Sequence, residues 1–190
     1  MQVHPAIPAV GALLLGGAAL ARVLSRDDRI ADRITDAYAW ATPALADRIV
    51  DVADVVDADP YTLANLINLE SGGDPRAVNG VTGATGLIQF IPSTARSLGT
   101  STAAIAQMSA LQQMDLVERY LERARDGRSL QAPHKLAMSV FYPAAMRWPS
   151  WTFFPLDVIR ANRWKIFTPG DYVERMANNS NLPTTTGMLS

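Results

Sequence analysis

Glu70 is the residue whose type and position most clearly suggest chemistry. Apolar residues recur at helical spacing before it, at Leu63, Leu66 and Ile67, and the next position on that stripe is Glu70 itself. A carboxyl on an apolar face loses water, and the carboxyl end of a helix adds a negative dipole, so both effects disfavour the charged form. An acid that keeps its proton near neutral pH suits general acid catalysis. The same spacing also fits a helix-terminal glutamate in a surface salt bridge.

Residues with strong local preferences predict the helix that carries Glu70. Asp59 is a candidate N-cap and Pro60 a candidate first helical residue. Gly72, a second glycine and then a proline should end the helix just after Glu70. The segment 71–86 is rich in Gly, Asn, Thr and Pro, which is typical of a loop. The carboxyl is therefore expected where a helix meets a long loop.

A second motif follows this loop. After Glu70-Ser71 comes the run Gly86-Leu87-Ile88-Gln89-Phe90. Together, in this order and at this spacing, the two motifs resemble the catalytic core of the SLT-type lytic transglycosylases. These are relatives of goose-type lysozyme that cleave peptidoglycan. The run TGATGLIQF over residues 82–90 resembles the phage-borne members most closely.

The resemblance covers about residues 50–176 and implies a mainly α-helical, lysozyme-like fold. It implies Glu70 as the sole catalytic carboxyl, and it places Ser71, Gln89 and Phe90 at the substrate cleft. Gln89 between two apolar residues could also be a buried amide, and Ser71 could orient Glu70 or cap a turn. A third family motif carries a tyrosine near the catalytic acid, commonly as Ala-Tyr-Asn-Ala-Gly. The nearest match, VFYPAA from residue 140, makes Tyr142 the candidate but lacks the Asn and Gly, and a core tyrosine is the alternative.

The implied reaction cleaves the β-1,4 bond between N-acetylmuramic acid and N-acetylglucosamine. Glycosidases commonly use two carboxyls, whereas in this family one glutamate protonates the glycosidic oxygen and then takes a proton from the muramoyl 6-hydroxyl. The product is a 1,6-anhydro sugar, formed without water, and no cofactor or metal is needed. Asp74 is near Glu70 in sequence but sits in a Gly-Asp-Pro turn, where aspartate usually forms the turn.

Composition excludes several other functions. The chain has 190 residues, no cysteine and two histidines, which leaves no thiol nucleophile, no thiolate metal site and no convincing Ser-His-Asp arrangement. The formal net charge is −1, which argues against a general nucleic-acid binder. An apolar content of 48% supports one folded domain with an appendage.

The remaining pattern predicts further helices at both ends of the core motifs. We expect an amphipathic helix over 27–41, a second from Pro43 to about Val56, and a short helix that Ser93 caps and Gly99 ends. A short piece over 102–108 precedes a long helix over 109–125, whose core side is expected to hold Leu111, Met114, Val117, Tyr120 and Leu121. Pro133 and Thr168-Pro169 begin two more helices.

The amino-terminal segment is a long uncharged run. Residues 6–21 carry no charge and Arg22 follows them; residues 6–24 are marginally long enough to cross a bilayer. A membrane-inserted helix, a secretory signal and a hydrophobic helix buried in an assembly are the three alternatives. The predicted divisions are an anchor over 1–26, a helical connector over 27–57, the transglycosylase domain over 58–176 and a flexible tail over 177–190.

These features lead to one main hypothesis and two rivals. The main hypothesis is a virion-associated, membrane-proximal lytic transglycosylase that opens the bacterial wall during phage genome ejection. Its partners would be peptidoglycan strands, a membrane through residues 6–24, and other virion proteins. The first rival is a hydrolytic lysozyme that uses the same Glu70. The second is a non-catalytic structural virion protein or wall-binding scaffold.

Overall fold

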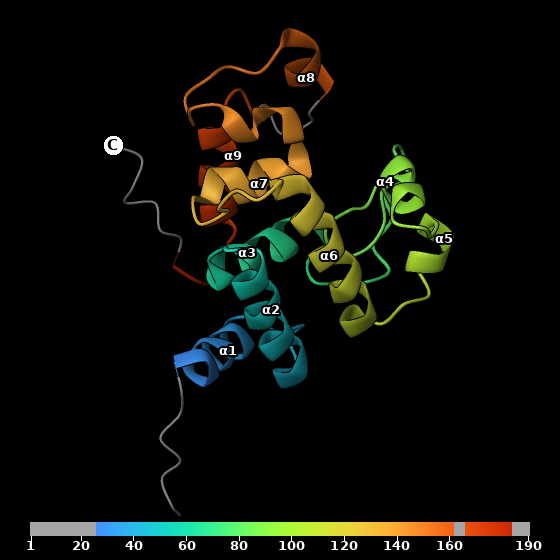
Figure 1. The fold of residues 1–190 in the computed structure, drawn as a ribbon, viewed down its shortest axis with the longest axis vertical. Coiled ribbons are helices and arrows are strands. Elements are labelled where there is room, and N and C mark those ends of the chain that lie inside the picture. The colour runs from blue at the N-terminus through green and yellow to red at the C-terminus, as the bar shows by residue number, and fades with distance from the viewer. Residues whose placement is uncertain (1–25, 162–165, 184–190) are drawn as a thin grey trace, which may run out of the picture.

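The computed structural model describes residues 26–161 and 166–183 and is mainly helical there (Figure 1). Besides its helices, the described part contains isolated β-bridges. The mainly α-helical class that the sequence predicts is therefore confirmed. The helices are α1 (Arg26–Ala37), α2 (Pro43–Val55), α3 (Pro60–Ser71), α4 (Pro92–Ser97), α5 (Thr102–Ile105), α6 (Ala110–Arg125), α7 (Pro133–Phe141), the 3-10 helix η1 (Pro143–Arg147), α8 (Leu156–Ala161) and α9 (Pro169–Asn178).

Helix α3, which carries Glu70, lies at the centre of the helical packing. It contacts α1, α2, α7 and α9, and Figure 1 shows it between the amino-terminal helices and the α7–α9 layer. Six consecutive residues from Thr62 to Ile67 are buried, so most faces of the helix are covered. A helix enclosed on several sides holds its last turn in a fixed place. That rigidity is what a catalytic side chain requires.

Both ends of α3 form as the sequence predicts. The Asp59 carboxylate accepts from the backbone N–H of Thr62 at 2.9 Å, and Pro60 is the first helical residue. Gly72 ends the helix in the left-handed conformation, with φ of 63°, and its N–H donates to the Asn68 carbonyl. The expected start and stop of this helix are confirmed.

Helices α1 and α2 pack against the rest of the protein instead of extending from it as a stalk. Ile34, Ile49 and Val52 are fully buried in the same hydrophobic core as α3, and α2 also packs along α6. Helix α1 ends at Ala37, earlier than the expected 41, and Pro43 begins α2 with Thr42 as its N-cap. The region 27–57, predicted as a connector, thus supplies part of the core.

The beginning of the predicted tail also has fixed contacts. Helix α9 extends to Asn178, the side-chain amide of Asn68 donates to the Asn179 carbonyl at 2.9 Å, and Leu182 is buried. The Ser180 hydroxyl accepts from Tyr38 at 3.3 Å. These contacts place residues 179–182 against α1 and α3, within the segment that the sequence assigns to a flexible tail from 177. Residues 184–190 lie outside the described part.

One predicted helix cap is wrong. Helix α4 begins at Pro92, one residue before the expected cap Ser93, and Ile91 occupies the N-cap position without a side-chain hydrogen bond. Proline has a fixed φ that suits the first helical residue, and this preference outweighs the capping preference of the serine that follows. By contrast, Ser109 caps α6 and Thr168 caps α9, each within a full capping box.

The predicted core face of α6 is wrong at one position. Leu111 is 43% exposed, whereas Met114, Val117 and Leu121 are buried as expected. The buried face also includes Gln113, which is two residues, and therefore about 200°, from Leu111 around the helix axis. Leu111 thus lies on the side of α6 opposite the buried glutamine.

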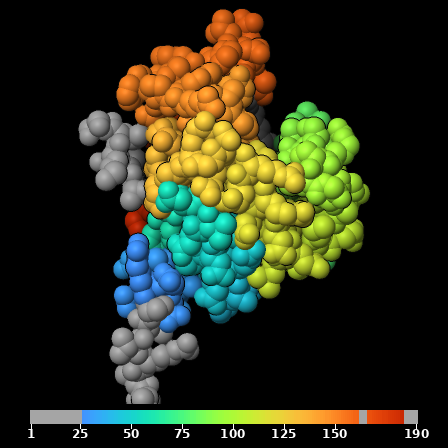
Figure 2. Space-filling view, in the orientation of Figure 1, coloured from blue at the N-terminus to red at the C-terminus, as the bar shows by residue number. Residues whose placement is uncertain are grey.

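The parts of the chain that flank the site form two lobes. The segments with α4 and α5 lie on one side of α6, and the segment with η1 and α8 lies on the other (Figure 1). In the space-filling view a notch separates these two lobes (Figure 2). Among the described helices, none has the length and apolar composition that crossing a bilayer demands. The predicted hydrophobic helix over 6–24 lies outside the described residues.

Candidate active site

Glu70 lies one residue before the end of α3 and is half-buried. Its hydrophobic neighbours on the helix, Leu63, Leu66 and Ile67, are fully buried. Glu70 is therefore the polar end of an otherwise apolar stripe, as the sequence predicts. The side chain lines a groove on the protein surface.

Tyr172 on α9 holds the Glu70 carboxyl. Its phenol donates a hydrogen bond to Glu70 Oε1, and its ring packs on Phe141 with 5.0 Å between ring centroids. The tyrosine is fully buried. Burial above all, then the charge of Glu70 and the hydrogen bond to it, raise the pKa of Tyr172 well above its ordinary value. The phenol therefore stays protonated and serves as a permanent donor to Glu70.

A groove of about 440 Å³ opens beside Glu70. One wall comes from the loop between α3 and α4, and the other from α7 and the end of α8. Among the described residues that line it, Glu70 is the one carboxylate; Asp74, the neighbouring acid in sequence, instead accepts from the N–H of Arg76 at 2.8 Å within a turn. The lining residues are Glu70, Asn79, Val81, Thr82, Ala84, Ile88, Gln89, Ile91, Val140, Phe141 and Ala161.

Gln89 lines the groove in an uncommon backbone conformation. Its φ is +55°, which non-glycine residues seldom adopt and which costs energy. The side-chain Nε2 donates to the carbonyls of Gly86 at 3.1 Å and Ala77 at 3.3 Å. With its nitrogen held by the protein, the amide oxygen Oε1 is the atom suited to accept from a ligand. The placement favours the predicted cleft role, which remains a prediction.

Ser71 faces away from the groove. Its hydroxyl lies 2.9 Å from the Leu87 carbonyl and 3.1 Å from the Ile67 carbonyl, and it accepts from the N–H of Gly73 at 3.2 Å. These contacts tie the end of α3 to the Gly86–Phe90 run. The geometry favours a structural role that keeps the loop beside Glu70 over a direct contact with substrate.

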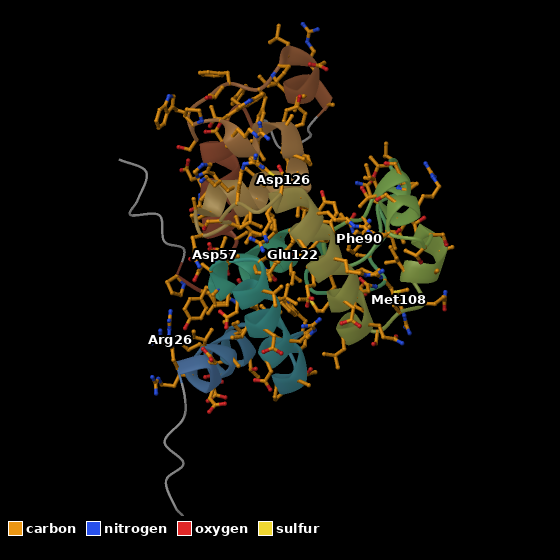
Figure 3. All side chains as sticks on the ribbon, viewed as in Figure 1. Arg26, Asp57, Phe90, Met108, Glu122 and Asp126 are labelled. Atoms are coloured by element: carbon orange, nitrogen blue, oxygen red, sulfur yellow. The ribbon has the colours of Figure 1, made fainter. Side chains whose placement is uncertain are left out.

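Like Ser71, the predicted cleft residues Phe90 and Tyr142 lie outside the described lining. Phe90 is 2% exposed and packs edge-on against Tyr120 of α6; Figure 3 labels it between α6 and the α4 lobe. Tyr142 packs on Trp148 and Phe154, each with 5.7 Å between ring centroids. Both rings pack against other aromatic side chains, which favours a packing role. The tyrosine that contacts the acid is Tyr172 instead.

Sequence reasoning missed Tyr172 and Phe141. By resemblance it expected the loop over 71–86 at the groove, but it singled out neither Asn79 nor Thr82. Tyr172 lies 102 residues after Glu70, and its helix reads as an ordinary amphipathic pattern. No spacing rule connects two residues that tertiary packing brings together. Phe141 is adjacent to Tyr142 in the segment that matches the third family motif. Which of these two aromatic side chains faces the groove depends on where α7 ends.

The described residues do not gather histidine, aspartate or glutamate in groups of three or more that would suit a metal ion. The chemistry that this site can perform rests on one carboxyl with a neutral phenol donor, a neighbouring amide, and apolar walls. Such a site can give a proton to a bound oxygen atom and take one back.

Comparison with known proteins agrees with the sequence motifs over part of the chain. The family model of the Transglycosylase SLT domain matches residues 53–115. A protein of Enterobacteria phage PRD1 described as "Transglycosylase" is 49% identical over 45 residues, which is 24% of this chain. The match spans 17% of that phage protein's length. No solved structure matches. Residues 53–115, which contain Glu70 and the Gly86–Phe90 run, therefore carry the signature of the SLT transglycosylase family.

Proposed function

We propose that the protein is a peptidoglycan lytic transglycosylase that cleaves the β-1,4 bond between N-acetylmuramic acid and N-acetylglucosamine. The observation that carries the proposal is a groove whose described lining contains a single carboxyl, Glu70, held by the buried Tyr172. The family match over residues 53–115 supports the same reaction. A two-carboxyl glycosidase would need a second acid about 5–10 Å from the first.

The first step is proton transfer from Glu70 to the glycosidic oxygen. Because Tyr172 donates to Oε1, that oxygen acts as an acceptor, and the proton to be transferred is carried on Oε2. The bond between C1 of the muramoyl sugar and the glycosidic oxygen breaks, and the N-acetylglucosamine end leaves with the proton. The substrate's own acetamido oxygen then stabilises the positive charge at C1.

The second step closes a ring within the muramoyl sugar. Glu70, now a carboxylate, takes the proton of the 6-hydroxyl as the oxygen attacks C1, and the acetamido oxygen is released. The Tyr172 phenol stabilises the carboxylate between the two steps, because a hydrogen bond to the charged form favours it. Glu70 ends protonated, the product is a 1,6-anhydro sugar, and no water is consumed.

The walls of the groove suit an amino sugar. Val81, Ile88, Ile91, Val140 and Phe141 provide apolar contact for the faces of sugar rings and for acetamido methyl groups. Asn79, Thr82 and Gln89 provide the few polar groups that fix orientation.

The substitution Glu70→Gln tests this proposal. It keeps the size of the side chain but removes the acidic proton. We expect at least about a hundredfold lower rate of soluble muropeptide release from purified peptidoglycan, the low end of general-acid contributions. The circular dichroism spectrum should match that of the wild type. A variant that still clears peptidoglycan at a near-normal rate would place the acid elsewhere, and an inactive wild type that binds peptidoglycan would favour a scaffold.

We further propose that the enzyme acts from a phage particle on the bacterial wall, during genome ejection. The support is the relative from a phage and the likeness of residues 82–90 to phage-borne members. Purified particles of the source phage should then contain the protein and release muropeptides from isolated walls. Particles that lack the protein, with activity confined to infected cells late in infection, would contradict virion association.

A further inference from the structure

Gln113 of α6 is a fully buried amide whose hydrogen bonds reach three separate segments near the groove. Its Oε1 accepts from the N–H of Leu87 at 2.9 Å. Its Nε2 donates to the carbonyls of Pro75 at 2.6 Å and Ile105 at 2.9 Å. Pro75 lies near the start of the loop after α3, and Leu87 lies in the Gly86–Phe90 run near its end. One side chain therefore joins both ends of the loop that forms a wall of the groove.

The backbone of Leu87 is held at both its N–H and its carbonyl. Gln113 accepts from its N–H, and the Ser71 hydroxyl lies 2.9 Å from its carbonyl oxygen. Ser71 is the residue next to Glu70. A continuous series of contacts thus runs from α6 through Leu87 to the turn of α3 that carries the acid. If Gln113 moved, Leu87 would move with it, and the distance between the last turn of α3 and the loop would change.

The fit around Gln113 is close. Gly86 precedes Leu87, and a Cβ atom at Gly86 would collide with Oε1 of Gln113. The φ of Gly86 is +84°, so a side chain there would also be strained. The Gly86 carbonyl accepts from the backbone N–H and from the Nε2 of Gln89, each at 3.1 Å. Gln89 is therefore placed by the same peptide segment that Gln113 holds.

We infer that Gln113 is a positioning residue for the reaction: it acts through Leu87 and Gly86 to set the place of Gln89 relative to Glu70. It is fully buried and is not among the described residues that line the groove. The inference rests on the proposed function and adds a residue to its machinery. A buried amide that merely satisfies the core would cost stability when replaced, but it would not change the activity of folded molecules.

A kinetic double-mutant cycle separates the two roles. The variants are Gln113→Met, Gln89→Ala and the double substitution, all assayed well below the melting temperature of the least stable one. We expect Gln113→Met to lower kcat/KM about tenfold, the equivalent of one lost hydrogen bond to substrate. In the Gln89→Ala background the same change should lower it less than about twofold, because coupled residues are not additive.

The matched control is Gln112→Met. Gln112 is the exposed neighbour on α6, and its Oε1 accepts from the N–H of Ser109 at 2.8 Å in the capping box. Its replacement should lower the melting temperature and leave kcat/KM unchanged. If Gln113→Met does not fold, Gln113→Glu takes its place: it removes the donor to the Pro75 and Ile105 carbonyls, and the same loss of additivity with Gln89→Ala is expected.

Two results would overturn the inference: wild-type kcat/KM in folded Gln113→Met, or full additivity of the two substitutions. If the wild type releases no product, the proposed function fails separately. The cycle is then run on the Kd of a soluble N-acetylglucosamine–N-acetylmuramic acid tetrasaccharide, measured by calorimetry. The same lack of additivity in Kd is expected, and additivity there would equally refute the positioning role.

Discussion

Replacing Tyr172 with phenylalanine removes one atom at the centre of the site. The phenolic oxygen donates to Glu70 Oε1, while the ring packs on Phe141. Phenylalanine keeps that ring, so Tyr172→Phe is expected to fold. What is lost is the hydrogen bond that favours the charged form of Glu70 and fixes the orientation of its carboxyl.

The size of the effect follows from this hydrogen bond. A hydrogen bond to a charged group contributes about 1.5–3 kcal/mol. Without it the carboxylate form of Glu70 loses that stabilisation, and the alkaline limb of the pH–rate profile should move to higher pH. The plateau rate should fall about tenfold to a hundredfold, because a catalytic group that is no longer oriented loses much of its advantage.

The assay is kcat/KM for muropeptide release across the pH range, since this quantity reports the ionisations of the free enzyme. Tyr142→Phe is the matched control, because the Tyr142 ring packs on Trp148 and Phe154. The alkaline limb of the pH–rate profile of this variant should stay at the wild-type pH. A limb that does not move in Tyr172→Phe, or that moves to lower pH, would refute donation by Tyr172 to the Glu70 carboxylate.

Two further predictions concern stability. Burial raises the pKa of Tyr120 to about 12 and that of Tyr172 well above its ordinary value. Above about pH 10 the unfolded chain therefore releases phenolic protons that the folded protein keeps, and the free energy of unfolding should fall by up to about 1.4 kcal/mol per pH unit for each tyrosine. Urea titrations at several pH values measure this fall. If the free energy of unfolding of Tyr120→Phe falls as steeply with pH between pH 10 and 12 as that of the wild type, the prediction for Tyr120 is wrong. Gly73→Ala should destabilise the protein by about 1–3 kcal/mol more than Gly72→Ala, because a Cβ at Gly73 collides with the Trp40 indole whereas one at Gly72 meets no atom within 4 Å. Equal melting temperatures for the two variants would rule out that collision.

Local sequence signals were enough to place the helix that carries Glu70. Asp59, Pro60 and Gly72 act within one or two turns of the chain, and each occupies the expected position. The acid on the apolar stripe also lies at a groove, as its position predicts. These inferences succeeded because they depend on backbone geometry and short-range hydrogen bonds, which the sequence determines directly.

The partners of the acid could not be predicted in the same way. Tyr172 reaches Glu70 only after α9 packs on α3 and α7. Phe90 was expected at the cleft, yet its ring is buried and packs edge-on against Tyr120 of α6. Tertiary contacts decide such choices, and the motif alone does not encode them.

The sequence pattern of α6 already indicated that Gln113 lies on its buried face. It precedes Val117 by four residues and Leu121 by eight, so it occupies the apolar stripe of α6. The reasoning that identified Glu70 on its stripe applies equally to this glutamine. A polar residue at a core position indicates either a satisfied amide or a functional group, and only the structure shows which atoms satisfy it.

The most direct test of the central claim is a digestion of purified peptidoglycan in water enriched in oxygen-18, followed by mass spectrometry of the muropeptides. If Glu70 acts as the single acid and base, the new muramoyl ends are 1,6-anhydro sugars. Those ends should be lighter by one water than hydrolysed ends and should carry no heavy oxygen. Muramoyl ends that contain oxygen-18 would show that water attacks C1, and they would contradict the ring-closing step assigned to Glu70.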